Sequence, residues 1–475
     1  MRAEASGGNA AQGGRIELLI LLVYLALWAM AVLAADPSCH QVGAVCANTG
    51  DRYGSWLSFH LLDGKWFDED PRQPEYAFTE MPPGHAFWLA GIFTIFGRSS
   101  FLPAVALQAL GLCVAALFAR RAMEKSLPGL GNPTLALLLL NPNVIAQTAL
   151  SQVDCVFMIA AIAILTLVLH YLNRPALGVA LATGLTVGVS AMIKVPGQYV
   201  MILLPIALPL LVALSPEPDL RQARPWRFAF AHGVAAALVA AVVVSPWAYH
   251  MWRAGEGVTL QNRGILALVL EDGSKYLGDR PLVLGDRATY RQLEATFESE
   301  STAQREAELA ARHPGFKDLP LSERNRLRRD WMIDLYLEFP GGVPVFLRAL
   351  VLSWARALLP GGEGEWHRLF GIEAQPEKSP SLFYGIKGIA LSLTLASRIL
   401  AVLGIFALFV RRRYDLLVLT VCWIGLFTGL TALVGNTRYR LPMELPLAML
   451  AAAGWLYLQA WWRARASSRP VGHIS

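Results

Sequence analysis

Residues 153–172 read VDCVFMIAAIAILTLVLHYL, and this run of twenty residues decides the class of fold. Asp154, at its start, is the only residue in the run that is charged at neutral pH. An apolar run of about 20 residues has the length that a helix needs to cross the hydrocarbon core of a bilayer. Similar runs recur along most of the chain, so the sequence predicts an all-α, polytopic membrane protein.

The composition agrees with this interpretation. Of the 475 residues, 55% are hydrophobic and only 16% are charged, and the mean hydropathy is +0.43. Soluble domains are usually about 25% charged, so the composition fits neither a disordered chain nor an ordinary soluble enzyme. The net charge of +6 does not indicate nucleic-acid binding, because membrane proteins gather basic residues in their cytoplasmic loops. We therefore expect membrane lipids as partners, and no nucleic acid.

The apolar runs predict about ten crossings of the membrane. The first run resembles a signal peptide, but its apolar part is long for one, so we expect an uncleaved helix. Asn141, Pro142 and Asn143 interrupt the third run. The ten predicted spans are 16–35, 100–119, 133–150, 153–172, 176–193, 196–214, 229–251, 387–410, 414–434 and 441–461.

The sidedness depends on the short apolar segment 84–97, which has about 14 residues. This is too short to span, so we expect an interfacial or re-entrant helix. Without it, the main basic clusters fall on the cytoplasmic side with both termini, as the positive-inside rule requires. Lys194, Arg438 and Arg440 are basic exceptions on the outer side. The cytoplasmic clusters are Arg120/Arg121, Arg174, Arg221/Arg224/Arg227, Arg411/Arg412/Arg413 and Arg463/Arg465.

Two large outer loops divide the chain. The apolar segment 343–359 of the second loop contains Arg348 and Arg356, and we expect it to lie on the membrane surface. A spanning helix there, which would reverse the sidedness of all that follows, is the alternative. The predicted parts are an N-terminal membrane module, 1–251, with the first outer loop at 36–99; the second outer loop, 252–386; and the C-terminal helices and cytoplasmic tail, 387–475.

The five cysteines separate by position. Cys113, Cys155 and Cys422 lie in apolar runs and are most simply small buried residues. Cys39 and Cys46 lie in the first outer loop, where they could form a disulfide if that side is oxidising. Two free thiols are the alternative.

Residues that could carry chemistry gather on the predicted outer side. Asp51 and Tyr53 stand at the start of a predicted amphipathic helix, 52–63, and Glu80 stands shortly before the segment 84–97. A helix N-cap is the alternative role for Asp51. Asp154 opens the span quoted above, where an acid at membrane depth points to function by default.

The basic residues of the outer side stand at span ends. Lys194 lies between two spans, where its alternative role is to snorkel to the interface. Arg438 and Arg440 lie between the last two spans. Arg440 stands four residues before Glu444, the spacing of an ion pair within a helix, so a structural role is the alternative for it. Arg438 is therefore the better candidate for binding an anion.

The order of these segments resembles the GT-C superfamily of membrane glycosyltransferases. The resemblance is strongest to bacterial relatives of the protein O-mannosyltransferases and of the lipid A aminoarabinose transferase. It covers most of the chain, although each motif is short. The matching motifs are Asp51 with Tyr53, LLDG at 61–64, PPG at 82–84, FG at 96–97, QVD at 152–154, KVP at 194–196 and RYRLP at 438–442.

The resemblance implies a GT-C-like fold and a sugar donor carried on a polyprenyl phosphate. It implies Asp51 as the base that accepts the proton of the acceptor hydroxyl, with Tyr53 nearby. Because Tyr53 follows Asp51 by two residues where the family pattern has about four, Asp63 and Glu80 stay open as alternatives for the base.

The chemistry of such a donor explains why the site would need one carboxylate base and several basic residues. A glycosyl phosphate already has a good leaving group, so one carboxylate base is enough. Lys194 with Arg438 or Arg440 would bind the departing phosphate, for which arginine is well suited. Glu80 and Asp154 would orient the acceptor or hold a divalent cation, the one cofactor that the oxygen ligands could suit.

The expected function is therefore glycosyl transfer to a lipid, glycan or protein acceptor on the periplasmic or extracellular side of the plasma membrane, with inversion at the anomeric carbon. A transporter or flippase of a lipid-linked saccharide is the rival, because a broken span and outer basic residues would serve it as well. The third hypothesis is an accessory scaffold protein whose catalytic site has degenerated.

Overall fold

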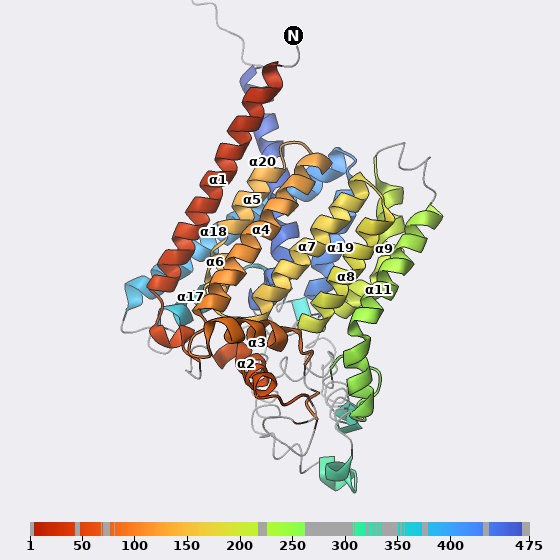
Figure 1. Ribbon diagram of the computed structural model, residues 1–475. Helices are drawn as coiled ribbons and strands as arrows, with labels where there is room; N and C mark the ends of the chain where they lie inside the picture. The colour runs from red at the N-terminus through yellow and green to blue at the C-terminus, as the bar shows by residue number, and fades with distance from the viewer. Residues whose placement is uncertain are drawn as a thin grey trace, which may run out of the picture.

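The computed structural model is a bundle of long helices with a layer of short helices across one end (Figure 1). The structure describes residues 4–42, 48–67, 69, 77–79, 81–216, 226–261, 307, 309–319, 323–324, 326–327, 330–331, 334, 350–351, 354–355, 357–372, 379–430 and 437–467, and the side chains of most of these.

The bundle follows the predicted apolar runs. The fold class is confirmed, because no strand occurs among the described residues and the long helices fall on these runs. The helices of the bundle are α1 (Glu4–Leu33), α4 (Leu102–Ser126), α5 (Gly131–Leu139), α6 (Pro142–Thr148), α7 (Val153–Asn173), α8 (Leu177–Ile193), α9 (Gly197–Leu214), α11 (Trp226–Arg253), α18 (Pro380–Val410), α19 (Tyr414–Leu430) and α20 (Glu444–Ser467).

Within the described residues, seven helices are long and apolar enough to cross a membrane. α8 and α19 have 17 residues each, and the run at 133–150 is divided between α5 and α6. These segments nevertheless lie alongside the long helices in Figure 1. The number of ten crossings therefore stays a prediction.

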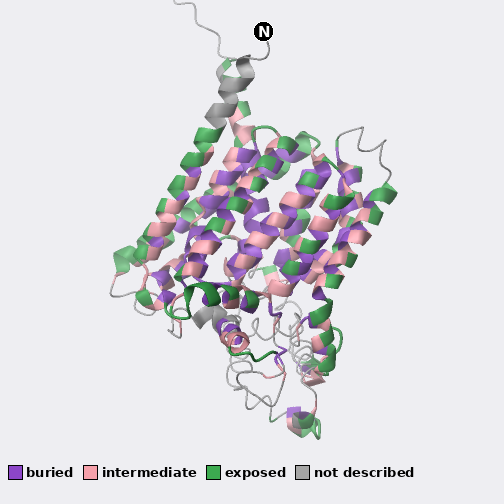
Figure 2. Ribbon diagram, in the orientation of Figure 1, coloured by how far each residue is buried: buried purple, intermediate pink, exposed green. Residues whose placement is uncertain are grey.

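The outer surface of the bundle is apolar, as expected for contact with lipid. Leu19 on α1, Ile206 on α9, Val242 on α11 and Val402 on α18 are each more than half exposed. Figure 2 shows that buried residues concentrate on the helices in the middle of the bundle, with exposed faces at its edges. Such an extensive exposed apolar surface is stable only in a non-aqueous environment.

The short helices lie across one end of the bundle, opposite the N-terminus (Figure 1). We call this end the outer end, after the sidedness that the basic loops predict. Described parts of both large loops lie there. The short helices at this end are η1 (Pro37–His40), α2 (Asn48–Leu62), α3 (Gly84–Phe96), η3 (Phe316–Asp318) and α17 (Glu363–Leu369).

α3 corresponds to the short segment 84–97, and it lies across the bundle rather than along it (Figure 1). Gly84, of the PPG motif, opens the helix against the end of α8, since a Cβ there would come 2.5 Å from the Met192 carbonyl oxygen. α2 packs against α3, with the rings of Phe59 and Phe93 stacked at 5.2 Å. The non-spanning orientation predicted for this segment agrees with the fold.

The LLDG motif ends α2 with a left-handed glycine. Gly64 has φ of +77°, and the amide of Lys65 donates to the His60 carbonyl at 3.0 Å while that of Gly64 donates to Leu61 at 3.1 Å. This is the Schellman arrangement, which glycine favours because it has no Cβ. The motif thus terminates the helix, and Asp63 lies exposed beyond it in an ion pair with Arg98.

Three helix starts differ from the sequence prediction by four residues or more, and α1 is one of them because it begins at Glu4 rather than at 16. α2 begins at Asn48 rather than at 52, so Asp51 lies inside the first turn and not at the N-cap. Asn and Thr are favourable at helix starts, and Asn48-Thr49 allows the earlier beginning. α18 begins at Pro380, seven residues before the predicted span, because proline is readily accommodated in a first turn.

Parts of the two loops lie beyond the described residues. Cys39 is disulfide-bonded, and Cys113, Cys155 and Cys422 are not. Cys113 and Cys155 are buried as predicted, but Cys422 is exposed, so the prediction that it is a buried residue is wrong. Cys46 lies outside the described residues, so the pairing of Cys39 with Cys46 stays a prediction. The surface helix at 343–359 also stays a prediction, because most of that segment is not described.

The common end of the two loops predicts a labelling pattern. Lys65→Cys and Ala311→Cys, each in a chain in which Cys113, Cys155 and Cys422 are replaced, should both react in intact cells with a membrane-impermeant maleimide, because both positions are exposed at the outer end. Arg411→Cys, exposed at the opposite end, is the control and should react only after permeabilisation. Labelling of Lys65→Cys and Arg411→Cys alike in intact cells would contradict the predicted sidedness.

Candidate active site

Asp154 and Lys194 lie together at two helix ends near the outer layer. α7 begins at Val153, so Asp154 is in its first turn, where the helix dipole favours a carboxylate. α8 ends at Ile193, and Lys194 has an extended backbone before the next helix begins. The Lys194 ammonium forms an ion pair with Asp154, whose side chain is only 4% exposed. The partner is what makes burial of this carboxylate tolerable.

The segment η5 (Thr437–Met443) brings Arg438 and Tyr439 to this ion pair. The Lys194 Nζ atom lies 4.4 Å from the centroid of the Tyr439 ring, and the Arg438 Cζ atom lies 4.8 Å from it. Arg438 also donates a hydrogen bond of 2.8 Å to the Tyr439 hydroxyl. Both cations are within the distance of about 6 Å at which an aromatic face attracts a cation. We call Asp154, Lys194, Arg438 and Tyr439 the Tyr439 cation site.

α17 adds a second buried acid that the sequence analysis missed. Glu365 is 3% exposed, pairs with Arg368 at 2.8 Å and interacts electrostatically with Arg438. α17 is held against the bundle by Trp366, whose indole nitrogen donates to the Pro142 carbonyl at 3.0 Å. The one sequence feature that could have pointed to Glu365 is the run EGEWHR at 363–368, in which acidic and basic residues flank a tryptophan. The rest of the second loop contains no recognisable motif.

Chemically, the Tyr439 cation site is suited to an oxyanion. Lys194 and Arg438 come from different elements, and both lie against one ring at the edge of the apolar bundle. Arginine offers two parallel N–H groups to phosphate or carboxylate, and lysine a compact point charge. Of the outer-side residues singled out from sequence, the structure brings Asp154, Lys194 and Arg438 together.

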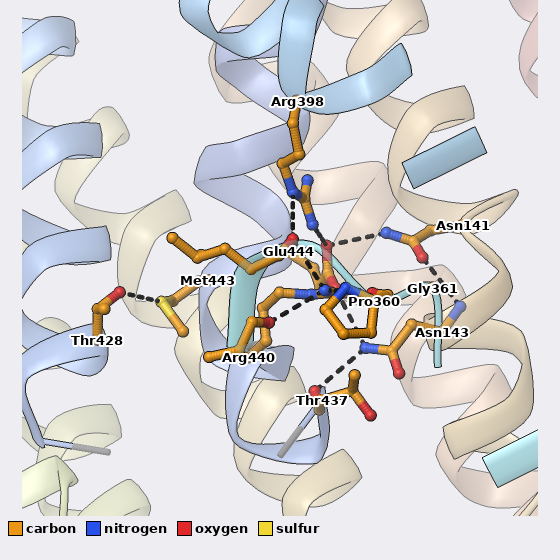
Figure 3. Close-up of polar contacts among 12 residues, drawn as sticks. Asn141, Asn143, Pro360, Gly361, Arg398, Thr428, Thr437, Arg440, Met443 and Glu444 are labelled. Carbon is orange, nitrogen blue, oxygen red and sulfur yellow. Dashed lines mark hydrogen bonds and ion pairs between the residues drawn. The ribbon is translucent and has the colours of Figure 1, made fainter. Parts of the chain in front are cut away.

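Arg440 belongs to a different cluster, centred on Glu444 (Figure 3). The Glu444 carboxylate is 1% exposed and accepts from Arg440 at 2.6 Å and from Asn141 at 2.8 Å. Asn143 donates to it at 3.2 Å, and Arg398 lies 3.5 Å away. We call these five residues the Glu444 cluster. The ion pair predicted from the spacing of Arg440 and Glu444 is therefore present.

The Glu444 cluster ties the second loop to the bundle. Arg440 Nη1 donates to the carbonyls of Ala357, Leu358 and Pro360 at 3.0, 3.1 and 2.6 Å. Arg398, on α18, donates to the Leu358 carbonyl at 2.9 Å. Arg440 thus crosslinks α20 to residues 357–360, and its side chain has no exposed surface.

The geometry of η5 explains why neighbouring arginines do different things. A 3₁₀ helix has three residues per turn, so successive side chains diverge by about 120°. Arg440 therefore points into the Glu444 cluster, while Arg438 lies against the Tyr439 ring. Pro442 contributes a carbonyl that accepts from the Trp423 indole at 2.8 Å, which fixes the end of η5 against α19.

The candidate base lies on α2. Asp51 and Tyr53 are in this helix, but their side chains are not among those described, and Glu80 lies outside the described residues. α2 packs on α3 and touches α7, the helix that carries Asp154. The roles of Asp51, Tyr53 and Glu80 stay predictions.

The divalent cation also stays a prediction. The described residues hold no group of three or more His, Cys, Asp and Glu side chains placed to bind a metal ion. Glu80, one of its two predicted ligands, is not described, and Asp154, the other, is paired with Lys194.

The sequence matches no known family profile and no curated protein sequence. Solved structures do resemble it. The apo oligosaccharyltransferase from Archaeoglobus fulgidus is 13% identical, with a TM-score of 0.52, over 95% of this chain and 52% of the other. The same enzyme tethered to an acceptor peptide gives 13% identity and a TM-score of 0.52, over 96% and 51%.

The chain has a GT-C-like fold. It spans about half the length of the oligosaccharyltransferase that it matches. ArnT from Cupriavidus metallidurans, bound to undecaprenyl phosphate, is 16% identical over 92% of this chain and 77% of the other; its TM-score of 0.39 is too low to support a common fold by itself. The GT-C-like fold that the motifs implied is confirmed, whereas identities this low leave the substrate open.

The Glu444 cluster predicts a large effect on stability. Glu444→Gln should lower the free energy of unfolding by about 3–5 kcal/mol, because two buried guanidinium groups lose their carboxylate. Thermal unfolding in detergent measures the change. The matched control is Glu323→Gln, which removes an exposed ion pair with Arg326 and should cost less than about 1 kcal/mol. Equal thermal unfolding midpoints for Glu444→Gln and Glu323→Gln would mean that the Glu444 cluster does not stabilise the fold.

Proposed function

We propose that this chain is an integral membrane glycosyltransferase that moves a sugar from a polyprenyl-phosphate donor to a lipid, glycan or protein acceptor. The observation that carries the proposal is the Tyr439 cation site, where Lys194 and Arg438 each lie within 5 Å of the Tyr439 ring centroid at the end of an apolar bundle. A lipid-linked phosphate would meet these cations while its tail stays beside the helices. The fold supports the proposal, because two solved structures with a TM-score of 0.52 are of an oligosaccharyltransferase.

The proposed reaction is a single displacement at the anomeric carbon. The Asp51 carboxylate accepts the proton of the acceptor hydroxyl, and the acceptor oxygen bonds to the anomeric carbon. The bond from that carbon to the phosphate oxygen breaks, and its electron pair stays on the phosphate, which gains one negative charge. Lys194 and Arg438 stabilise this charge where it develops. The configuration at the anomeric carbon is inverted.

The other outer-side residues receive supporting roles in this proposal. Tyr53 and Glu80 bind the acceptor in this proposal, and a divalent cation bound by Glu80 would assist. Asp154 holds Lys194 in position through their ion pair. Arg440 acts through stability, because its side chain is buried in the Glu444 cluster.

The break between α5 and α6, which would suit a transporter, has a structural explanation. Asn141 and Asn143, at the break, both donate to Glu444. The Asn141 side chain also caps α6 by accepting from the Asn143 amide at 2.9 Å. The two asparagine amide groups at the break are therefore bonded within the protein, which gives these polar residues a structural role.

We place the reaction on the outer face of the plasma membrane. The Tyr439 cation site lies at the end of the bundle that carries the two large loops, opposite the basic clusters near Arg411 and Arg465. Basic residues mark the cytoplasmic side of a membrane protein. The donor phosphate would therefore be bound at the periplasmic or extracellular surface.

Replacing the proposed base should stop transfer. Asp51→Asn should lower the turnover number by about 10²–10⁴-fold, because the amide cannot accept the proton. The assay supplies membrane vesicles with a panel of radiolabelled polyprenyl-phosphate sugars and follows label in the acceptor. Glu323→Gln is the control, since Glu323 is an exposed acid paired with Arg326 and has no role in the proposed reaction. Full activity in Asp51→Asn would move the base to Glu80 or Asp63, and absence of any transfer by the intact chain would favour the transporter or scaffold.

Replacing the proposed phosphate ligands should weaken donor use. Lys194→Ala and Arg438→Ala should each raise the donor KM and lower kcat/KM by about 10- to 100-fold, because each removes a charge-assisted hydrogen bond. Arg98→Ala, which removes another cation of the outer end, should leave both constants within about three-fold. If the donor KM is unchanged in both site variants, Lys194 and Arg438 do not bind the donor phosphate and only anchor the protein at the membrane interface.

A further inference from the structure

The Tyr439 cation site poses an electrostatic problem before any ligand binds. The Lys194 Nζ and Arg438 Cζ atoms lie 4.4 and 4.8 Å from the same ring centroid, so two like charges share one aromatic ring. Near the membrane, where the dielectric constant is low, their repulsion is stronger than in water. Asp154 pairs with Lys194 directly, and Arg438 interacts with Asp154 and Glu365 at longer range.

We propose that Tyr439 is a positioning residue for the donor phosphate: its ring face holds Lys194 and Arg438 together so that a phosphate meets two aligned cations. The inference rests on the proposed function, and it names a residue to which that function assigns no role. The ring supplies negative electrostatic potential on its face and carries no net charge. It can therefore hold the cations without competing with the phosphate as a carboxylate would.

The surroundings of Tyr439 fit this role. Its hydroxyl accepts a hydrogen bond of 2.8 Å from Arg438, which adds a directional contact to the attraction of the ring. The next residue, Arg440, is fixed by Glu444 and by carbonyls of the second loop. The backbone of η5 is thus anchored immediately beside Tyr439, so the ring can orient its two cations rather than follow them.

The alternative is that Tyr439 merely fills space beside Lys194. A packing role predicts that any side chain of similar size preserves binding. A role through the ring predicts that binding depends on the π electrons, and that the dependence disappears when the cations are removed. These two outcomes separate the explanations.

The test uses the full chain in nanodiscs of neutral lipid, with undecaprenyl phosphate as the probe and native mass spectrometry as the readout. Tyr439→Leu should weaken binding about ten-fold, because the attraction of both cations to the ring is lost. Tyr439→Phe, which keeps the ring, should stay within about three-fold of the unmodified protein. Tyr249→Leu is the matched control, since Tyr249 is exposed on α11 and lies outside the site.

A graded series guards against misfolding of the leucine variant. Phenylalanine at position 439 with one, two and three fluorine atoms keeps the shape of the ring while it removes electron density from the face. Affinity should fall stepwise along the series. A constant affinity along it would overturn the inference, because shape alone would then explain the site.

A double-mutant cycle separates this inference from the proposed function. In a Lys194→Ala/Arg438→Ala background, Tyr439→Leu should change the affinity by less than two-fold, since the ring has no cation left to hold. A full ten-fold loss in that background would overturn the inference and leave the phosphate site standing. If Lys194→Ala/Arg438→Ala itself binds undecaprenyl phosphate as tightly as the unmodified chain, the phosphate site of the proposed function is wrong.

Discussion

The Glu444 carboxylate is buried in the protein, and four side chains from three separate parts of the chain neutralise and bind it. Arg440 comes from η5, Arg398 from α18, and Asn141 and Asn143 from the break between α5 and α6. A buried charge is tolerable only with such partners. The need to satisfy this one group therefore fixes how the C-terminal helices, the broken helix and the second loop meet.

The position of the proposed site follows from that arrangement. Because Arg440 is anchored inside the protein, Arg438 and Tyr439 lie toward the ends of α7 and α8. Asp154 and Lys194 are located at these two helix ends. One cation of the Glu444 cluster and one cation of the Tyr439 cation site thus come from the same short segment. The separation depends on the 3₁₀ geometry of η5, because an extended strand would have pointed both arginines to the same side.

Two of the short motifs, LLDG and PPG, have structural roles at the edges of this arrangement. Gly64 ends α2 in a left-handed conformation, and Gly84 allows α3 to approach the end of α8. Each belongs to the outer layer that lies across the bundle (Figure 1). These residues bring the loop that contains Asp51 over the end of α7 without themselves doing chemistry.

Sequence by itself determined the membrane class, the apolar runs, the break at Asn141–Asn143 and the Arg440–Glu444 pair. These features depend on local hydropathy and on contacts between residues near in sequence, which patterning encodes directly. The sequence pattern missed Glu365 and placed the start of α2 too late, because neither a lone acid in a long loop nor the exact first turn of a helix has a strong local signal.

Only the tertiary structure decided which distant polar residues meet. The pairing of Lys194 with Asp154, and the contact of Lys194 with the Tyr439 ring, join segments far apart in the chain. The hydrophobic periodicity of the sequence does not predict such contacts, because they form only when helix ends meet at one end of the bundle. The chemistry proposed for this chain therefore rests on an arrangement that the residue types suggested and that folding alone could assemble.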